Sequence, residues 1–258
     1  MQIDIQQRFV YKTFFSLFLQ VFFRIKKEVY CFGLKMKQPL IKFTKPQPPL
    51  VAERLFHRLI WRLPQKEKTV FLTFDDGPVP IYTPEILDCL KQYNVPATFF
   101  CVGENITQHT DIFEQIIVNG HVVGSHTFNH FNGWFSKNKE YYENVRKGAK
   151  ISGSRLFRPP YGKITFAQAR HLSKYFDIVM WDVLSKDYDP NTSNEQCYQN
   201  IIQNVQNGSI VVLHDSKKTH KKIQYVLPKT IEWLLQNNYK LKAITPEIIF
   251  QQNISSSS

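Results

Sequence analysis

The chain lacks closely spaced cysteines. Its four cysteines stand at positions 31, 89, 101 and 197 and form no CxxC motif. Zinc–thiolate sites and disulfide frameworks need clustered or more numerous cysteines, so the sequence excludes both. Cys89 falls in a helical pattern and Cys101 in an apolar strand. This predicts buried free thiols and mildly favours a reducing compartment.

The sequence also lacks an apolar run long enough to cross a membrane. Residues 13–23 (TFFSLFLQVFF) are strongly apolar and flanked by basic side chains, but a spanning helix needs about 20 residues. No small-residue cleavage site follows, so we expect no cleavable signal peptide. Two interpretations stay open: residues 1–35 form a weak membrane-surface anchor, or translation starts at Met36. The location accordingly stays open between cytoplasmic and membrane-associated.

Basic charge is scarce outside the N-terminal segment. The formal net charge is +12, yet residues 1–68 contain 14 Lys and Arg against 4 Asp and Glu, and residues 69–258 contain 19 against 17. A basic stripe with interleaved aromatic residues is typical of nucleic-acid-binding domains. The second segment has no such stripe. We expect no nucleic-acid partner, and we expect a monomer.

Length and composition fit a single catalytic domain. The chain has 258 residues, of which 43% are hydrophobic, enough for the core of one barrel-sized domain. Residues 1–50 are predicted to be a basic and hydrophobic extension that ends in a Pro-rich linker. Residues 51–250 form the predicted domain, which begins with a short helix over 54–63. Residues 251–258 are predicted to be a disordered tail.

From residue 69 onward, short apolar strands alternate with amphipathic helices. Strands are predicted over 70–74, 97–102, 121–124, 156–158, 178–182, 210–213 and 239–243, and helices over 83–93, 110–118, 138–151, 165–174, 194–207 and 223–237. Such alternation indicates parallel strands joined by right-handed crossovers. Seven units in about 180 residues favour a small, incomplete α/β barrel over an open sheet.

Two adjacent carboxylates, Asp75 and Asp76, follow the first predicted strand. Gly77 and Pro78 come next and force a turn. Like charges at the mouth of a buried strand repel each other and lose hydration, and a bound cation would offset this cost. The alternative for this motif alone is a solvated acidic turn.

Polar clusters follow four further predicted strands. They are SHTFNH at 125–130, RPPYG at 158–162, WDVLSKDY at 181–188 and His214-Asp215. Parallel βα folds place their chemistry at the carboxyl ends of strands. We therefore expect all of these clusters to lie on one rim, together with Asp75 and Asp76.

His126 and His130 are four residues apart, so one helical or turn-like segment places both imidazoles on the same side. Alone, this spacing is also typical of two surface histidines. Two imidazoles and a carboxylate on one rim favour a divalent transition metal, zinc most readily. Three protein ligands leave positions open for water and substrate, as in catalytic sites.

The motifs TFDDGP, SHTFNH, RPPYG and VVLHD, in this order within residues 68–245, resemble those of the NodB-homology polysaccharide deacetylases, carbohydrate esterase family 4. The resemblance implies a distorted (β/α)7 barrel with one divalent metal ion, Zn²⁺ first and Co²⁺, Mn²⁺ or Ni²⁺ as alternatives. It also implies an acetylated glycan as substrate: N-acetylglucosamine polymers such as peptidoglycan or chitin-like oligomers first, and O-acetylated xylan second.

By position, the resemblance implies which residues are the metal ligands, the base and the partner of the base. Asp76, His126 and His130 would hold the metal, and Asp75 would be the general base. Arg158 would pair with Asp75 and keep it ionised.

The later motifs would supply the remaining groups. The resemblance implies that the backbone N–H of Tyr161 stabilises the oxyanion, that His214 is the general acid, and that Asp187 orients and charges its imidazole. An alternative for His214 is a strand-end histidine capped by Asp215.

The chain departs from the family pattern near Asp187. The usual first carboxylate of this motif is replaced by Leu184, the usual Trp by Tyr188, and a common leucine by Val212. These changes affect the expected shape of the acetyl pocket and groove. They also leave open a second function, a glycan-binding module that has lost catalysis.

Overall fold

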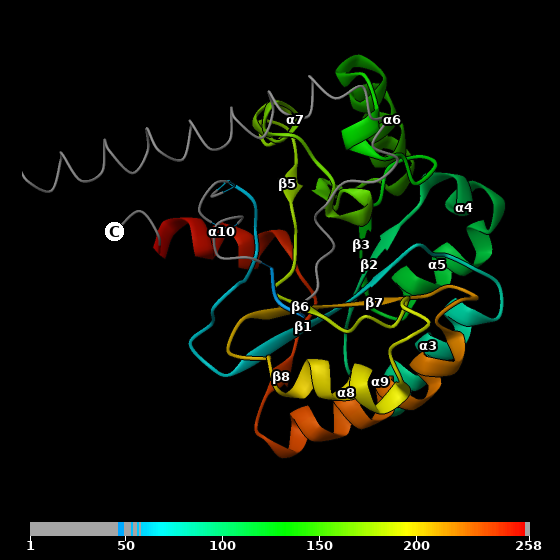
Figure 1. The fold of residues 1–258 in the computed structure, drawn as a ribbon, viewed down its shortest axis with the longest axis vertical. Helices are drawn as coiled ribbons and strands as arrows, with labels where there is room; N and C mark the ends of the chain where they lie inside the picture. The colour runs from blue at the N-terminus through cyan, green and yellow to red at the C-terminus, as the bar shows by residue number, and fades with distance from the viewer. Residues whose placement is uncertain (1–45, 49–52, 54–55, 57, 256–258) are drawn as a thin grey trace, which may run out of the picture. The chain divides into compact units, whose positions relative to one another are not determined.

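The computed structural model describes residues 46–48, 53, 56 and 58–255 (Figure 1). The predictions for residues 1–45, including a membrane anchor and a start at Met36, lie outside these residues, as does the end of the tail at 256–258. Within the described part of the chain, no helix is long and apolar enough to cross a membrane.

A parallel sheet of eight strands forms the centre of the described region. Its strands are β1 (Thr69–Asp75), β2 (Thr98–Cys101), β3 (Val122–Ser125), β4 (Leu156–Phe157), β5 (Asp177–Ile178), β6 (Val183–Leu184), β7 (Ser209–His214) and β8 (Lys240–Leu241). They follow the order β5-β4-β3-β2-β1-β7-β6, and β8 pairs with the start of β1. All seven residues of β1 are buried, as expected for a central parallel strand covered on both faces.

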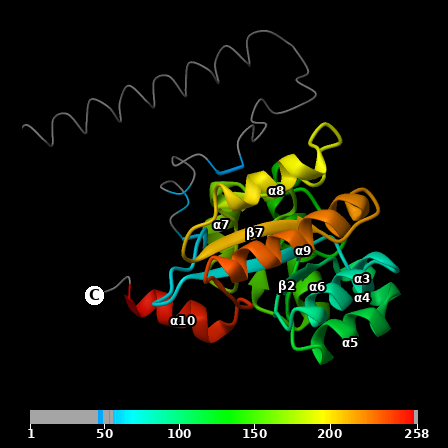
Figure 2. The same ribbon diagram turned by 90° about the horizontal axis from the view of Figure 1, so that it is seen from below.

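Helices connect the strands and cover the sheet (Figures 1 and 2). They are α3 (Tyr82–Gln92), α4 (Gly103–Gln108), α5 (Thr110–Val118), α6 (Asn138–Ser152), α7 (Phe166–Leu172), α8 (Asn194–Ile202), α9 (His220–Gln236) and α10 (Pro246–Ser255), with 3-10 turns η1 (Gly133–Phe135) and η2 (Pro160–Gly162). The fold is thus the curled, parallel α/β half-barrel expected from the sequence.

Side chains of β1 alternate between two cores. Val70, Leu72 and Phe74 pack with apolar residues of α3, α8 and α9. Phe71 belongs to the second core, which includes residues of α6, α7 and α10. Because alternate residues of a strand face opposite sides, Asp75 shares the side of Phe71, which faces the second core.

The predicted strand over 178–182 and the predicted helix over 54–63 differ from the structure. The predicted strand overlaps β5 only at residue 178, and β6 begins after it, at residue 183. The two short strands lie at opposite ends of the strand order. The described residues 58–63 are not helical: Ile60 bridges to Val179, and Arg62 bridges to Ser209. Pairing with segments distant in sequence determines the conformation of both regions. Local hydrophobic periodicity does not indicate such pairing.

Helix α10 continues through residues 251–255, where the sequence predicts a disordered tail. Pro246 suits a first helical position, and the side chain of Ile249 is buried in the second core. Burial of this side chain anchors the helix against the domain.

Asp182 links the segment between β5 and β6 to β7. Its Oδ1 accepts a hydrogen bond from the Ile210 N–H at 2.7 Å, and its Oδ2 accepts one from the Ser209 hydroxyl at 2.8 Å. Burial raises the pKa of Asp182 to about 6 despite these bonds. The strength of the hydrogen bonds between Asp182 and β7 therefore depends on pH.

We predict that Asp182→Asn will become more stable relative to wild type as the pH rises from 4 to 7. A carboxyl whose folded pKa exceeds its unfolded pKa stabilises the fold at low pH, and this contribution is lost as the pH rises through about 6. The difference in unfolding free energy between the variant and wild type should change by roughly 1.4 kcal/mol per unit of pKa shift. Urea unfolding across this range measures it, with the exposed Asp88→Asn as control. Parallel stability curves for Asp182→Asn and wild type would contradict the prediction.

Candidate active site and metal centre

The turn after β1 is held by contacts from other elements. Asp76 has φ 90°, a conformation that few non-glycine residues adopt. Asn105 Nδ2 donates a hydrogen bond to its carbonyl at 2.7 Å. The next residue, Gly77, donates its N–H to Asp215 Oδ1 at 2.8 Å, and a Cβ on Gly77 would lie 1.8 Å from Asp215 Oδ2. Only glycine fits this approach, so Asp215 fixes the turn that presents Asp76.

Asp76, His126 and His130 come together at the carboxyl ends of β1 and β3. Each offers a ligand atom, and these atoms lie within 4.8 Å of one another. His130 Nε2 is 3.2 Å from Asp76 Oδ1, and His126 Nε2 is 3.8 Å from it. Burial would raise the pKa of Asp76, but the hydrogen bond from His130 and the charges of nearby histidines lower it overall. The donor set suits a divalent cation.

The tautomer of His126 is fixed by the backbone. Its Nδ1 lies 2.9 Å from the Arg158 carbonyl oxygen. A carbonyl can only accept, so Nδ1 must carry the proton and Nε2 presents its lone pair towards Asp76. Burial lowers the pKa of His126 to about 4, which keeps the imidazole neutral. A neutral imidazole with its second nitrogen bonded to a backbone carbonyl is typical of a metal ligand.

The segment that carries both histidines, residues 126–130, is an irregular loop with a bend at residues 128–129 and not a helix. The Gly103 N–H donates to the Thr127 carbonyl at 2.9 Å. From α6, Asn144 Oδ1 accepts a hydrogen bond from the Phe128 N–H at 2.9 Å. Gly148 of α6 approaches so closely that a Cβ there would lie 2.5 Å from the Thr127 carbonyl carbon. Helices α4 and α6 therefore set the position of both histidines.

Asp75 forms a buried ion pair with Arg158. Nη1 of Arg158 lies 2.7 Å from Asp75 Oδ1 and 2.7 Å from the Thr73 hydroxyl. The guanidinium donates its other hydrogen bonds to the carbonyls of residues 179–180 and lies over the Phe100 ring at 4.0 Å. The side chain is fully buried. These contacts satisfy a charge that would otherwise be costly to bury.

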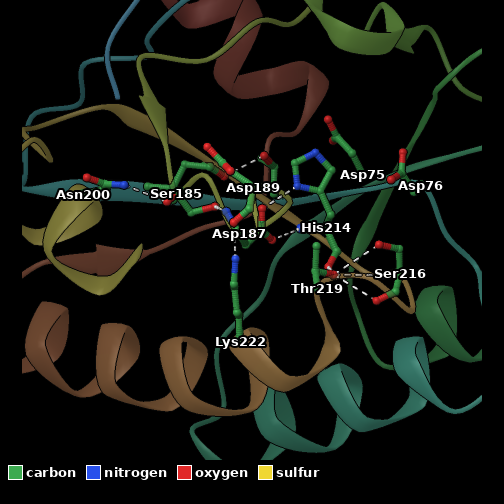
Figure 3. Close-up of polar contacts among 12 residues, drawn as sticks. Asp75, Asp76, Ser185, Asp187, Asp189, Asn200, His214, Ser216, Thr219 and Lys222 are labelled. Atoms are coloured by element: carbon green, nitrogen blue, oxygen red, sulfur yellow. Dashed lines mark hydrogen bonds and ion pairs between the residues drawn. The ribbon is translucent and has the colours of Figure 1, made fainter. Parts of the chain in front are cut away.

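His214 is held by Asp187, which stands 27 residues earlier. Asp187 Oδ1 lies 2.7 Å from His214 Nδ1, and Oδ2 accepts the His214 backbone N–H at 2.8 Å (Figure 3). Burial lowers the pKa of His214, but the charge and hydrogen bond of Asp187 outweigh it and raise the pKa to about 10. The imidazole is therefore charged. The neighbouring carboxylate of Asp215 binds Gly77 and the Thr83 hydroxyl, so capping of His214 by Asp215 is wrong.

A cleft of about 670 Å³ joins these groups. Its walls include the members of the metal group, together with Asp75, Tyr161 and His214. Tyr161 has φ 61°, and its ring lies edge-on to that of His130 at 4.6 Å. The cleft thus brings together every cluster that follows a predicted strand.

The three residues that depart from the family pattern also line the cleft. They are Leu184, Tyr188 and Val212. Leu184 and Val212 are buried, whereas Tyr188 is 45% exposed. The Tyr188 ring stands edge-on to His214 at 5.5 Å. Despite Leu184 and Tyr188, Asp187 binds His214 at hydrogen-bonding distance.

Sequence reasoning missed several residues that support the site. They are Thr73, Asn105, Asn144, Gly148 and Asp215. The signal for Gly148 is a glycine inside a helix, which costs about 1 kcal/mol relative to alanine and therefore suggests a packing requirement. No local signal identifies the partners of Asn105 or Asn144, because each bonds a segment distant in sequence.

The comparisons with known proteins agree with this geometry. Residues 62–178 match the family model described as polysaccharide deacetylase. A peptidoglycan-N-acetylglucosamine deacetylase of Bacillus cereus is 31% identical over 195 residues, which are 72% of this chain and 90% of that protein. A chitooligosaccharide deacetylase of Azorhizobium caulinodans is 32% identical over 60% of this chain and 77% of that protein. In longer relatives the match is partial, for example 33% of the PgdA deacetylase of Listeria monocytogenes.

A solved structure has the same fold. The crystal structure of the Bc1960 peptidoglycan N-acetylglucosamine deacetylase, in complex with 4-naphthalen-1-yl-N-oxidanyl-benzamide, has a TM-score of 0.69 and is 33% identical. The match covers 72% of this chain and 91% of that chain. This chain therefore belongs to the NodB-homology polysaccharide deacetylases, carbohydrate esterase family 4.

We predict that Gly148→Ala will weaken binding of a divalent ion by 10-fold or more. The added methyl group overlaps the Thr127 backbone, and mutations of residues that support metal ligands typically cost about 10- to 100-fold in metal affinity. Isothermal titration of metal-free protein with Zn²⁺ measures the change. Lys150→Ala, on the exposed side of α6, serves as control. Unchanged affinity in a folded Gly148→Ala variant would contradict the prediction.

Proposed function

We propose that the protein is a metal-dependent hydrolase that removes acetyl groups from N-acetylglucosamine-containing polysaccharide. The observation that carries the proposal is that Asp75 and His214 line one cleft together with Asp76, His126 and His130. Arg158 holds Asp75, and Asp187 holds His214. The chemistry is amide hydrolysis, in which water and an N-acetyl group yield acetate and an amine.

The proposed metal ligands are Asp76, His126 and His130, and Zn²⁺ is the first candidate. One carboxylate and two imidazoles suit zinc, with Co²⁺, Mn²⁺ or Ni²⁺ as alternatives. A divalent ion held there would supply a Lewis acid that polarises the acetyl carbonyl and lowers the pKa of water.

Asp75 is proposed as the general base. Its carboxylate would accept the proton of the attacking water. Arg158 supports this role, because its Nη1 donates a hydrogen bond of 2.7 Å to Asp75 Oδ1 and fixes the orientation of the carboxylate. The backbone N–H of Tyr161 is the proposed donor to the oxyanion on the acetyl carbon.

His214 is proposed as the general acid. With its pKa raised to about 10, the imidazole carries the proton that the leaving nitrogen needs. Since Nδ1 is bonded to Asp187, Nε2 is the nitrogen that can donate. A divalent ion nearby would lower this pKa, because its positive charge repels the imidazolium. Asp187 would thus preserve the proton in the presence of the metal.

The relatives support a glycan substrate. Those described above are named as deacetylases of peptidoglycan N-acetylglucosamine and of chitooligosaccharides. Peptidoglycan or chitin-like oligomers are therefore the first candidates, and O-acetylated xylan is the second. Weak membrane association through residues 1–35 and a monomeric state stay predictions.

We expect acetate release from N-acetylated oligosaccharides to depend on a divalent ion. Chelation should abolish release, and Zn²⁺ or Co²⁺ should restore it, because the Lewis acid would be removed and returned. A coupled acetate assay across N-acetylated and O-acetylated glycans measures activity and substrate choice together. Full turnover by protein shown to be metal-free would sink the proposal. Tight glycan binding without acetate release, at full metal occupancy, would favour a module that has lost catalysis.

Asp75→Asn should lower kcat by roughly 10²- to 10⁴-fold, because the amide cannot accept the proton of water. Its oxygen can still accept from Arg158, so metal content and fold should be retained. Acetate release and metal analysis test this together, with Asp88→Asn as an exposed control. Wild-type turnover in Asp75→Asn would show that another group is the base.

A further inference from the structure

The acid loop, residues 185–189, is held from two helices (Figure 3). Asn200 Nδ2 on α8 donates a hydrogen bond to the Ser185 carbonyl oxygen at 3.0 Å. Lys222 Nζ on α9 donates one to the Asp189 carbonyl oxygen. These two carbonyls stand two residues before and two residues after Asp187. The loop is thus fixed on both sides of the carboxylate that binds His214.

The backbone of the acid loop needs such support. Lys186 has φ 62°, and a non-glycine residue in this region costs of order 1–3 kcal/mol unless its surroundings impose the conformation. Within the loop, the Asp187 N–H has a long hydrogen bond of 3.3 Å to Ser185 Oγ. The Asp189 N–H also donates to the Lys186 carbonyl at 3.1 Å. The loop thus has two internal hydrogen bonds, and the two helices add one on each side of Asp187.

Asn200 is itself oriented for this contact. The side chain is buried, and its Oδ1 accepts a hydrogen bond from Gln196 Nε2 at 3.0 Å. The Ser185 carbonyl can only accept, so it assigns Nδ2 of Asn200 as the atom that faces it and leaves Oδ1 to accept from Gln196. Helices α8 and α9 also pack against each other, so the two donors belong to one supporting layer.

We propose that Asn200 and Lys222 are positioning residues for His214. They hold the acid loop so that Asp187 keeps the imidazole aimed into the cleft. The inference rests on the proposed function and on the role of His214 as general acid. Neither side chain is among the residues that line the cleft, so each acts through Asp187 and not through the substrate.

The variants Asn200→Leu and Lys222→Met remove the donors and keep most of the side-chain volume. Each should lower kcat for N-acetylated oligosaccharides roughly 10- to 100-fold, part of the about 10²–10⁴ that a general acid contributes. KM should change by less than about twofold, because binding contacts are intact. Lys222→Arg and Asn200→Gln keep a donor and should restore much of the rate.

A second substrate separates positioning from general damage. Turnover of 4-nitrophenyl acetate should stay within about twofold of wild type, because the weakly basic nitrophenolate leaves without a proton from His214. Gln203→Leu, at the C-cap of α8, and Lys221→Met, on α9, are exposed controls and should behave as wild type on both substrates. An equal fall on both substrates, or no fall on the N-acetylated one, would overturn the inference.

The inference has a readout that needs no activity. Proton NMR should show a low-field resonance from the His214 Nδ1 proton bonded to Asp187. The resonance should shift or disappear in Asn200→Leu and Lys222→Met and persist in the two controls. If wild type releases no acetate, the proposed function fails, and the resonance still tests the positioning: an unchanged resonance in both variants would reject it.

Discussion

The buried guanidinium of Arg158 connects the parts of the candidate site. It pairs with Asp75 and Thr73 on β1, donates to the carbonyls of residues 179–180, and lies over an aromatic ring. Its own carbonyl accepts the Nδ1 proton of His126. A buried charge is tolerated only with such complete pairing. The same residue therefore fixes the carboxylate proposed as base and the tautomer of a proposed metal ligand.

Two separate ion pairs orient the two groups proposed to transfer protons. Asp75 is held from β4 through Arg158, and His214 is held from the acid loop through Asp187. The candidate metal ligands line the same cleft as Asp75 and His214, on segments that α4 and α6 support. Because the strands are parallel, their carboxyl ends bring these groups to one rim. The departures from the family pattern at Leu184 and Tyr188 change the wall of the cleft. Both ion pairs are retained.

Much of the fold was predictable because β1 and β7 are long apolar runs separated by amphipathic helices. The errors concern elements with weak local signals. Strands β5 and β6 have two residues each and exist through pairing with segments distant in sequence. Residues 58–63 contain apolar side chains compatible with a helix, but bridges to Val179 and Ser209 decide their conformation. Periodicity cannot report such pairing.

The sequence by itself determined which groups stand at the strand ends and hence the family and the candidate donors. Only the tertiary structure decided which of them bind one another. Asp215 adjoins His214 in sequence yet fixes the Gly77 turn, whereas Asp187, 27 residues away, binds the imidazole. The reason is geometric: hydrogen bonds need a specific distance and direction. The Asp215 carboxylate follows β7 and is bonded to Gly77 and Thr83, so a loop from another part of the chain supplies the partner of His214.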